Sequence, residues 1–338
     1  MARPNRTTKP DTIDAVAQAA GVSTMTVSRV MRGQENVSGK TKTKVLEAAQ
    51  ALGYIHNRLA SSLASSSSAQ IAVIIPSLRN SVFPEVLAGI TDTLDGTGFQ
   101  AVIGVTDYDL ERERDLVTSM MSWRPAGMII TNTTHHEDVV RILSSANIPV
   151  VEVMELSESP IDMCVGLDHR EAGREMALHL IEKKYRGFGY LGTDHEADKA
   201  AAARFEGFRE ILEENGLPFE AVLTIQEPSG IGLGRENMKQ LLAMSDSLDA
   251  VYFSNDSVAA GAMMYCMAEG IEIPDQLALA SFSGLEIASA MPIPITTISS
   301  PRYNMGTLST ELVLARIKGK SVGSMHDSGF QLCSGASA

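Results

Sequence analysis

The sequence predicts two unlike parts, an all-α headpiece and an α/β body of two lobes with doubly wound parallel sheets. Apolar residues recur at helical spacing in the first 54 residues, which indicates short packed helices. From Ile71 onward, short apolar runs alternate with amphipathic stretches, a pattern typical of parallel sheets covered by helices on both faces. A chain of 338 residues is also too long for one ordinary core. We place the headpiece at residues 1–56, a hinge helix and linker at 57–69 and the body at 70–338.

Charge is distributed unevenly between these parts. Residues 1–64 carry nine Lys or Arg against four Asp or Glu, a net charge of +5; because the whole chain carries −13, the remainder carries −18. A basic arm on an acidic body is typical of a protein that approaches a polyanion, although a solvated basic face gives the same count.

Composition excludes several other classes. No stretch reaches the roughly 18 unbroken apolar residues of a membrane helix, and the basic N-terminus has no apolar segment behind it to make a secretory signal. The three cysteines are odd in number, far apart and without metal-like spacing, which favours a reducing compartment. We therefore expect a cytoplasmic bacterial protein with no metal, cofactor or membrane contact.

Three short helices are expected in the headpiece. Thr12 can cap the first of them, and Gly21 gives the tight turn that ends it. Ser23 can cap a second helix over Thr24–Met31, and a third helix follows Ser38. The apolar face of the first helix is formed by Ile13, Val16, Ala17 and Ala20.

Two short helices joined by a glycine turn are typical of a helix-turn-helix, in which the start of the second helix faces base edges in the major groove of DNA. Arg29 can donate two hydrogen bonds to a guanine, whereas Met25 can make only apolar contact, for instance with a thymine methyl. A plain three-helix core with exposed polar residues is the alternative. The residues expected at DNA from these helices are Thr24, Met25, Thr26, Ser28, Arg29 and Asn36.

The segment that follows the headpiece makes a more specific pattern. Residues 57–64 are long enough for two helical turns, too few to be stable alone in water, and they lead into the serines 65–68, a flexible joint. The run TIDAVAQAAGVSTMTVSRVMRG, with VSGKTKTKVLEAAQALGYIHNRLASSLA after it, resembles the headpiece and hinge of the lactose-repressor (LacI) family.

This resemblance implies a homodimer whose hinge helices pair in the minor groove of a palindromic operator. Leu63 takes the place of the leucine that wedges into the central base step, which kinks the duplex. Asn57 and Arg58 are then expected to contact the DNA backbone or groove nearby. The family commonly has proline where this chain has His56, so the rigid entry to the hinge is a departure from the pattern.

The body supports the same resemblance, since it is similar to the periplasmic-binding-protein-like effector domain of the family. Eight strands are expected, at Ile71–Pro76, Ala101–Thr106, Gly127–Thr131, Pro149–Val153, Phe188–Gly192, Ala221–Ile225, Ala250–Ser254 and Leu277–Phe282. Helices are expected at Phe83–Gly96, Leu110–Trp123, Arg170–Lys184, Arg204–Asn215 and Ser257–Gly270. One lobe then takes residues of about 70–167 and 298–325, and the other about 168–297 and 326–338.

Ligands of such folds bind on loops at the carboxyl ends of strands. Arg204 matches the family arginine that clamps the effector, and Asn255-Asp256 matches a strand-end pair that binds ligand hydroxyls. Glu152 lies on an otherwise apolar strand, where a carboxylate needs a partner. The residues expected to bind the effector are Arg79, Asn80, Phe83, Thr133, His135, Glu152, Arg204, Asn255, Asp256, Phe282 and Ser283.

The chemistry of the effector is indicated by one departure. Many sugar-binding members have Gly-aromatic-Asp after the eighth strand, whereas this chain reads SFSG at residues 281–284 and lacks the carboxylate. An anionic ligand would be repelled by that carboxylate, and positive partners for it are available from Arg204, Arg79, Lys199 and His135.

The segments PSLRNSVFPEVLAGI, SMMSWRPAGMIIT, IPVVEVME and DSGFQL together resemble the gluconate-repressor branch of the family. We therefore expect a sugar-acid effector such as gluconate, with a neutral sugar or nucleoside as the alternative. We expect effector binding to release the protein from the operator. The alternative is a corepressor, which would instead strengthen operator binding.

Three other classes explain less of the sequence. A periplasmic binding protein shares the body but has no use for the headpiece. An enzyme is disfavoured because the glycines at 230–234 follow no obvious strand and lack a P-loop lysine, and no nucleophile elbow is present. A nucleoid architectural protein does not need a ligand-type body. We expect a dimeric, sequence-specific transcriptional regulator, since no tetramer-forming heptad tail follows Phe330.

Overall fold

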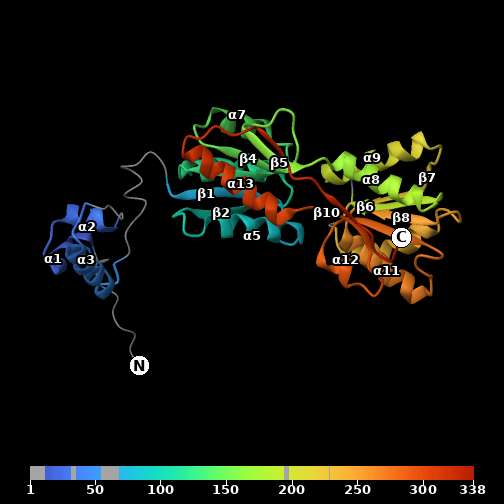
Figure 1. Cartoon of the computed structure of the whole chain (residues 1–338), viewed down its shortest axis with the longest axis horizontal. Helices are drawn as coiled ribbons and strands as arrows, with labels where there is room; N and C mark the ends of the chain where they lie inside the picture. Colours follow the sequence, from blue (N-terminus) through green and yellow to red (C-terminus); the bar gives the residue numbers. More distant parts are fainter. Residues whose placement is uncertain (1–11, 32–35, 55–67, 194–197, 228) are drawn as a thin grey trace, which may run out of the picture. The chain divides into compact units, whose positions relative to one another are not determined.

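A computed structural model describes residues 12–31, 36–54, 68–193, 198–227 and 229–338 of the chain (Figure 1). Contacts divide the chain into two compact units, Met1–Ser68 and Ala69–Ala338. Within the described ranges no helix has the length and apolarity to cross a membrane. The expected hinge residues Asn57, Arg58 and Leu63 lie outside the described residues.

The headpiece consists of α1 (Ile13–Ala20), α2 (Thr24–Met31) and α3 (Gly39–Ala51), as the apolar spacing predicts. The Thr12 hydroxyl accepts from the backbone N–H of Ala15 at 3.3 Å, which caps α1. Gly21 ends that helix in the left-handed conformation, with φ of 66°. The small core of the three helices is formed by Val16, Ala17, Ala20, Val27, Val30, Val45 and Ala49.

Two six-stranded sheets form the body, one in each lobe. The first has the order β11-β5-β4-β3-β1-β2 and the second β12-β10-β9-β8-β6-β7. Strands pair in parallel throughout both sheets except where β12 runs antiparallel to β10. The predicted fold class, a helix-turn-helix headpiece with a two-lobed, parallel α/β body, is confirmed.

The strands of the first sheet are β1 (Gln70–Ile75), β2 (Gln100–Val105), β3 (Gly127–Thr131), β4 (Val150–Glu155), β5 (Met163–Leu167) and β11 (Met325–Asp327). The second sheet contains β6 (Phe188–Thr193), β7 (Phe219–Ile225), β8 (Ala250–Phe253), β9 (Ala278–Ser283), β10 (Thr296–Ser299) and β12 (Gln331–Cys333). The last part of the chain therefore contributes a strand to each sheet. The expected lobe limits at 298 and at 325–326 lie within β10 and β11.

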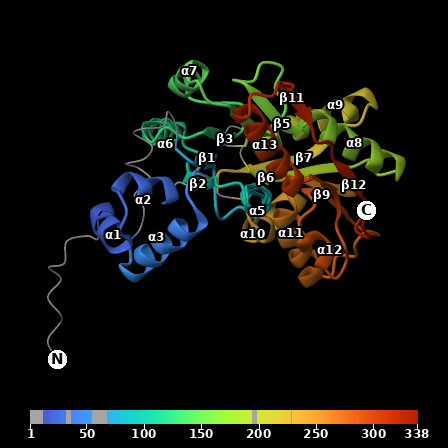
Figure 2. The same ribbon diagram turned by 60° about the vertical axis from the view of Figure 1, so that its left-hand side comes forward.

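Helices cover both sheets. The first lobe carries α5 (Val82–Leu94), α6 (Leu110–Ser122), α7 (Glu137–Ser145) and α13 (Arg302–Ile317). The second lobe carries α8 (His169–Glu182), α9 (Lys199–Glu214), α10 (Ile231–Leu242), α11 (Asp256–Glu269) and α12 (Glu286–Ala290). Three pairs of these helices pack directly on each other, α5 with α13, α8 with α9 and α10 with α11 (Figures 1 and 2).

Each of these three crossings depends on a glycine from both helices. A Cβ added to any of the six glycines would come within 2.1 Å of a backbone oxygen of the partner helix, so only glycine permits this approach. The six are Gly89, Gly306, Gly173, Gly207, Gly234 and Gly261.

The glycine run at 230–234 belongs to one of these crossings. It follows β7 closely and begins α10, so the expectation that it follows no strand is wrong. Its last glycine packs against the Val258 carbonyl oxygen of α11, which gives the run a packing role.

Candidate DNA-reading helix and ligand pocket

The start of α2 presents an exposed face. Its inner residues, Val27 and Val30, are buried, whereas Thr24 and Arg29 are exposed and the Met25 side chain is 61% exposed. Such an apolar side chain at the open end of a short helix gains from contact with a partner surface. The three exposed residues therefore lie where the helix-turn-helix pattern places base contacts.

The other residues expected at DNA lie close to that face. Thr26 is half-buried, and its hydroxyl is 2.9 Å from the Ser23 hydroxyl that caps α2. Ser28 is also half-buried, and Asn36 is exposed before α3. Along α3, Lys40, Lys42 and Lys44 are exposed, which provides the cations that a phosphate backbone attracts.

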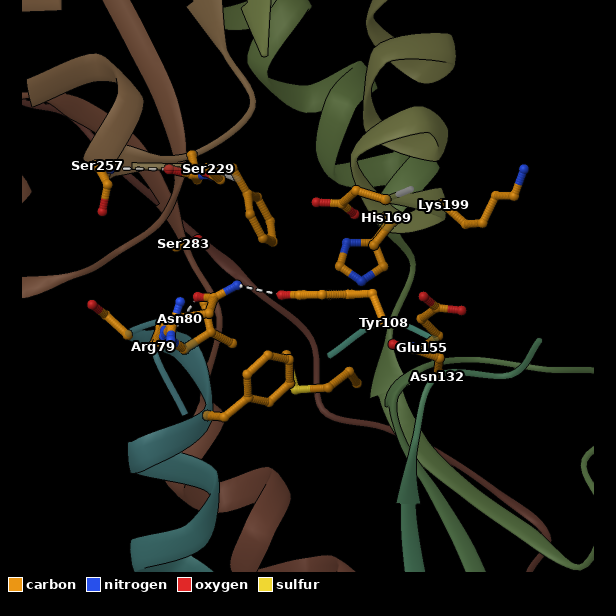
Figure 3. Close-up of a pocket in the computed structure, with 18 of the residues that line it drawn as sticks. Arg79, Asn80, Tyr108, Asn132, Glu155, His169, Lys199, Ser229, Ser257 and Ser283 are labelled. Carbon is orange, nitrogen blue, oxygen red and sulfur yellow. Dashed lines mark hydrogen bonds between the residues drawn. The ribbon is translucent and has the colours of Figure 1, made fainter. Parts of the chain in front are cut away.

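The body contains a cavity of about 470 Å³ that is lined by residues of both lobes (Figure 3). Its walls are loops and helix starts at the carboxyl ends of the parallel strands, where α/β folds bind ligands. The expected ligand residues that line the cavity are Arg79, Asn80, Phe83, Arg204, Asn255, Phe282 and Ser283. Sequence reasoning did not single out the lining residues Tyr108, Glu155, His169, Asp198 and Ser229.

Arg204 is a buried cation in the wall of this cavity. Because Gly173 lets α9 approach α8, the arginine lies opposite His169, and its Nη1 donates to the Nδ1 of that histidine at 2.9 Å. Nη2 donates to the Ser254 carbonyl at 3.0 Å, and the guanidinium carbon lies 3.9 Å from the Phe282 ring centroid. The residue is only 5% exposed. Within the described ranges, no carboxylate forms an ion pair with it.

His169 is the neutral partner of that cation. It begins α8 directly after β5, and burial, together with the nearby charge of Arg204, lowers its pKa well below the ordinary value. A neutral imidazole accepts a hydrogen bond without cancelling the positive charge. The guanidinium therefore has no carboxylate within ion-pair distance in the described ranges, although its charge acts on the nearby Glu155 carboxyl and opposes the rise of that group's pKa.

Glu155, at the end of β4, is an acidic residue in the wall of the same cavity. Burial raises the pKa of its carboxyl, an effect that the hydrogen bond from Thr133 opposes. The Thr133 hydroxyl donates to Glu155 at 2.8 Å, so Thr133, which does not line the cavity, orients a residue that does. Nearby, Asn80 donates to the Tyr108 hydroxyl at 3.0 Å, which joins the loops after β1 and β2 (Figure 3).

Two further expected ligand residues, His135 and Glu152, lie in a buried ion cluster beside the cavity. His135 Nδ1 is 3.0 Å from Glu113 and its Nε2 is 3.4 Å from Glu152. Burial lowers the pKa of His135, but the two carboxylates outweigh it and raise the pKa to about 9. Of the three, only Glu113 lines the cavity. Glu152 thus has the partner that its apolar strand requires, and it also accepts from the Ile161 N–H at 2.6 Å.

The Asn255-Asp256 pair divides between cavity and core. The Asn255 amide oxygen caps α11 and its Nδ2 donates to the Ser229 hydroxyl at the cavity wall. Asp256 is fully buried, away from the lining. It accepts from Ser281, Thr297 and the Leu285 N–H at 2.5 to 2.6 Å, and so joins α11 to β9 and β10.

Backbone strain is concentrated at the cavity. Four lining residues other than glycine have positive φ: Tyr108 at 63°, Asn132 at 69°, Met154 at 96° and Ser283 at 123°. Such conformations cost about 1–3 kcal/mol each and are retained mainly at functional sites.

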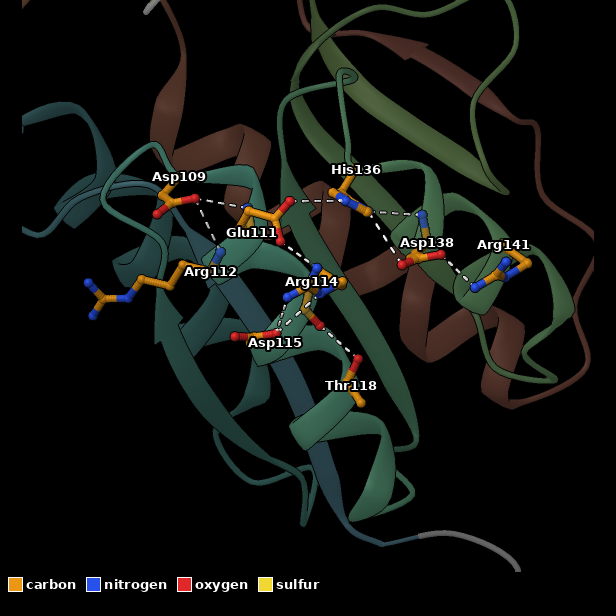
Figure 4. A network of polar contacts seen from close by, with 9 residues as sticks. All are labelled: Asp109, Glu111, Arg112, Arg114, Asp115, Thr118, His136, Asp138 and Arg141. Carbon is orange, nitrogen blue, oxygen red and sulfur yellow. Dashed lines mark hydrogen bonds and ion pairs between the residues drawn. The ribbon is translucent and has the colours of Figure 1, made fainter.

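A second polar network, on α6 and α7, has a different character (Figure 4). Its ion pairs join exposed or partly exposed side chains, such as Arg141, whose side chain is 78% exposed, with Asp138, whose side chain is 30% exposed. Exposed pairs of this kind contribute at most about 1 kcal/mol. In the part of the chain that the structure describes, no group of His, Cys, Asp and Glu is arranged to hold a metal.

Comparisons with known proteins agree with this geometry. Residues 12–57 match the family model of bacterial regulatory proteins, lacI family, and residues 177–337 match a periplasmic binding protein-like domain. The HTH-type transcriptional regulator GntR of Escherichia coli strain K12 is 36% identical over 97% of this chain and 99% of its own. The regulator IdnR of the same strain is 32% identical over 90% of this chain and 91% of its own.

Solved structures are similar over the same length. A LacI family regulator from Silicibacter pomeroyi has a TM-score of 0.92 and 41% identity, over 96% of this chain and 98% of that one. The lac repressor dimer bound to operator and an anti-inducer has a TM-score of 0.86 and 25% identity, over 97% and 99%. The chain therefore belongs to the LacI family of bacterial regulatory proteins and is a DNA-binding transcriptional regulator, not an enzyme.

Proposed function

We propose that the protein is a homodimeric repressor that binds a palindromic operator and is released from it by a sugar acid such as gluconate. Thr24, Met25 and Arg29 on the open face of α2 support base contacts in the major groove. The exposed lysines of α3 support contact with phosphates.

The buried guanidinium of Arg204 carries the proposal for the effector. A buried charge without an ion-pair partner is costly. The groups in direct contact with Arg204 include a neutral imidazole, a carbonyl and an aromatic ring, and Glu155 interacts with its charge without forming an ion pair. A carboxylate in the cavity would complete this set with charge-assisted hydrogen bonds. Ser283 lies where many sugar-binding members have an aspartate, so an anion meets no opposing charge there.

The rest of the cavity suits a polyol. Hydroxyl, amide and carboxyl groups of Tyr108, Asn132, Glu155, Ser229 and Asn255 line it, and such groups donate to and accept from sugar hydroxyls. A volume of about 470 Å³ lies within the range of small-molecule sites. A sugar acid combines the carboxylate and the hydroxyls that these two parts of the cavity require.

Release from the operator requires that the effector bind the DNA-incompetent state more tightly. Ordinary coupling between two sites amounts to about 1–3 kcal/mol. The strands of both lobes end at the cavity, so a ligand that contacts both lobes favours one angle between them. In the proposed mechanism, this change in angle unpairs the hinge segment of the dimer.

Calorimetric titration of the full chain with gluconate, related aldonates and glucose tests the effector. We expect the aldonates to bind and glucose, which lacks the carboxylate, not to bind. Arg204→Gln should abolish aldonate binding. Arg209→Gln, on the same helix but exposed and paired with Glu206, is the matched control and should bind as the unmodified chain does. Binding of glucose alone, or unchanged aldonate affinity in Arg204→Gln, would overturn the proposal.

A further inference from the structure

A second buried arginine, Arg302, lies where the chain crosses from one lobe to the other. It is the first residue of α13 and follows β10 of the second sheet, whereas α13 packs on α5 and on strands of the first sheet. The residue is 3% exposed. A buried guanidinium at a crossover between lobes can contact both of them at once.

The contacts of Arg302 divide between the lobes. On the second lobe, Nη1 donates to the Ser283 carbonyl and, at 3.1 Å, to the Ser300 hydroxyl, and Nη2 is 3.2 Å from the Gly284 carbonyl. On the first lobe, Nη2 is 3.1 Å from the carboxylate of Glu85 in the first turn of α5. One planar group therefore joins two segments that are distant in the sequence.

Both of these segments reach the cavity. Ser283 lines it with a φ of 123°, a conformation that costs energy unless the surroundings hold it. The hydrogen bonds from Arg302 to the carbonyls of Ser283 and Gly284 provide such a hold. On the other side, α5 begins at the cavity, since its cap Ser81 and its first residues Val82 and Phe83 line it.

We propose that Arg302 is a positioning residue that fixes the Ser283 wall of the effector cavity to α5 of the opposite lobe through Glu85. The effector itself rests on the function proposed above, whereas the link between lobes does not. Removing the link should loosen the Ser283–Gly284 turn, weaken effector binding and leave the fold of each lobe intact.

Glu85 is the residue to change, because its side chain is half exposed and a substitution at buried Arg302 risks the fold. Glu85→Ala removes the carboxylate that anchors the Arg302 guanidinium on α5. Glu85→Gln keeps an oxygen acceptor without the charge, and its effect should be intermediate between that of Glu85→Ala and the unmodified chain. Asp92→Ala is the matched control. Asp92 is also on α5 and accepts from Tyr303 of α13 at 3.1 Å, but this pair lies within the first lobe.

Hydrogen–deuterium exchange of the full chain without ligand is the first measurement. The Leu285 N–H donates to buried Asp256, so peptides that span 281–287 report on the turn. We expect exchange there to be several-fold faster in Glu85→Ala than in Asp92→Ala or the unmodified chain, while the central strands of both sheets keep their exchange rates. Equal exchange in all three proteins would overturn the link.

Calorimetry with gluconate is the second measurement. We expect affinity to fall about fivefold in Glu85→Ala, the scale of a half-exposed ion pair, and to stay unchanged in Asp92→Ala. Affinity that is unchanged in Glu85→Ala, or reduced equally in both variants, would contradict the positioning role. If the unmodified chain binds no aldonate while Glu85→Ala exchanges faster, the proposed effector is wrong and the link is supported.

Discussion

Stability of the body should depend on the charge of His135. This histidine lies between Glu113 and Glu152 with a side chain that is 1% exposed, and its pKa is raised from 6.5 to about 9. At about 1.4 kcal/mol for each pH unit between the unfolded and folded values, the cluster contributes on the order of 3 kcal/mol to the free energy of unfolding. Because the folded pKa is the higher one, this contribution is complete below pH 6.5 and is lost as the pH rises through about 9.

Urea unfolding from about pH 6 to pH 9.5, followed by the fluorescence of Trp123, measures this contribution. Trp123 is the one tryptophan of the sequence and ends α6, the helix that carries Glu113. His135→Gln should lose most of the difference in unfolding free energy between the two ends of that pH range. His136→Gln, in the neighbouring surface network, should keep it. Identical pH dependence in His135→Gln and the unmodified chain would show that the histidine is not charged in the folded cluster.

Three other substitutions test separate parts of the structure. Gly207→Ala places a Cβ 2.0 Å from the Arg170 carbonyl oxygen and should lower the free energy of unfolding by about 1–3 kcal/mol, measured by thermal unfolding. Gly232→Ala is the control, because the nearest atom to its Cβ is 3.9 Å away. Equal thermal midpoints of the two variants would contradict the close packing of α8 on α9. Arg29→Ala should cost about 1–3 kcal/mol at one operator position, measured on operator variants, and an unchanged preference would make Arg29 a phosphate contact only. Leu63→Ser should reduce DNA bending, measured by the gel mobility of the DNA complex, while effector affinity is retained. A fall in effector affinity would contradict the separation of DNA bending from effector binding.

Periodicity predicted the regular elements well. The eight expected strands, and the expected helices apart from the start of α9, lie within two residues of the observed limits. The helix α9 begins five residues early, at Lys199. Its signal was present in the sequence, because Asp198 caps a run of alanines, and alanine is the strongest helix former.

Several of the elements that sequence reasoning missed were hard to recognise for physical reasons. The strand β5 is as short and as fully buried as β3, which was predicted, but its sequence MCVGL contains one β-branched residue where GMIIT contains three, so its strand signal is weaker. The helix α10 was missed because its glycines argue against a helix, although a close crossing requires one of them. The strands β11 and β12 have three residues each, and only pairing with distant strands defines them.

Prediction of the cavity residues was limited because contacts between residues far apart in the chain do not show in the sequence. Phe83 and Asn255 could be placed at its wall because each lies shortly after the end of a strand. Arg204, which lies inside α9, was placed there by its match to the family arginine. His169 and Glu155 were missed, since their roles depend on contacts with residues far away in the chain, such as Arg204 for His169. Glu152 was noticed as an uncomfortable carboxylate, but its partner His135 comes from another strand end.

Operator binding in the presence of effector tests the proposed function most directly. The full chain would be titrated, by fluorescence anisotropy at fixed salt, onto the palindromic DNA that it selects from random sequence, with and without saturating gluconate. We expect gluconate to weaken operator binding by about 5- to 150-fold in the unmodified chain and to have no effect in Arg204→Gln. Operator affinity that gluconate leaves unchanged or increases in the unmodified chain would contradict release by a sugar acid.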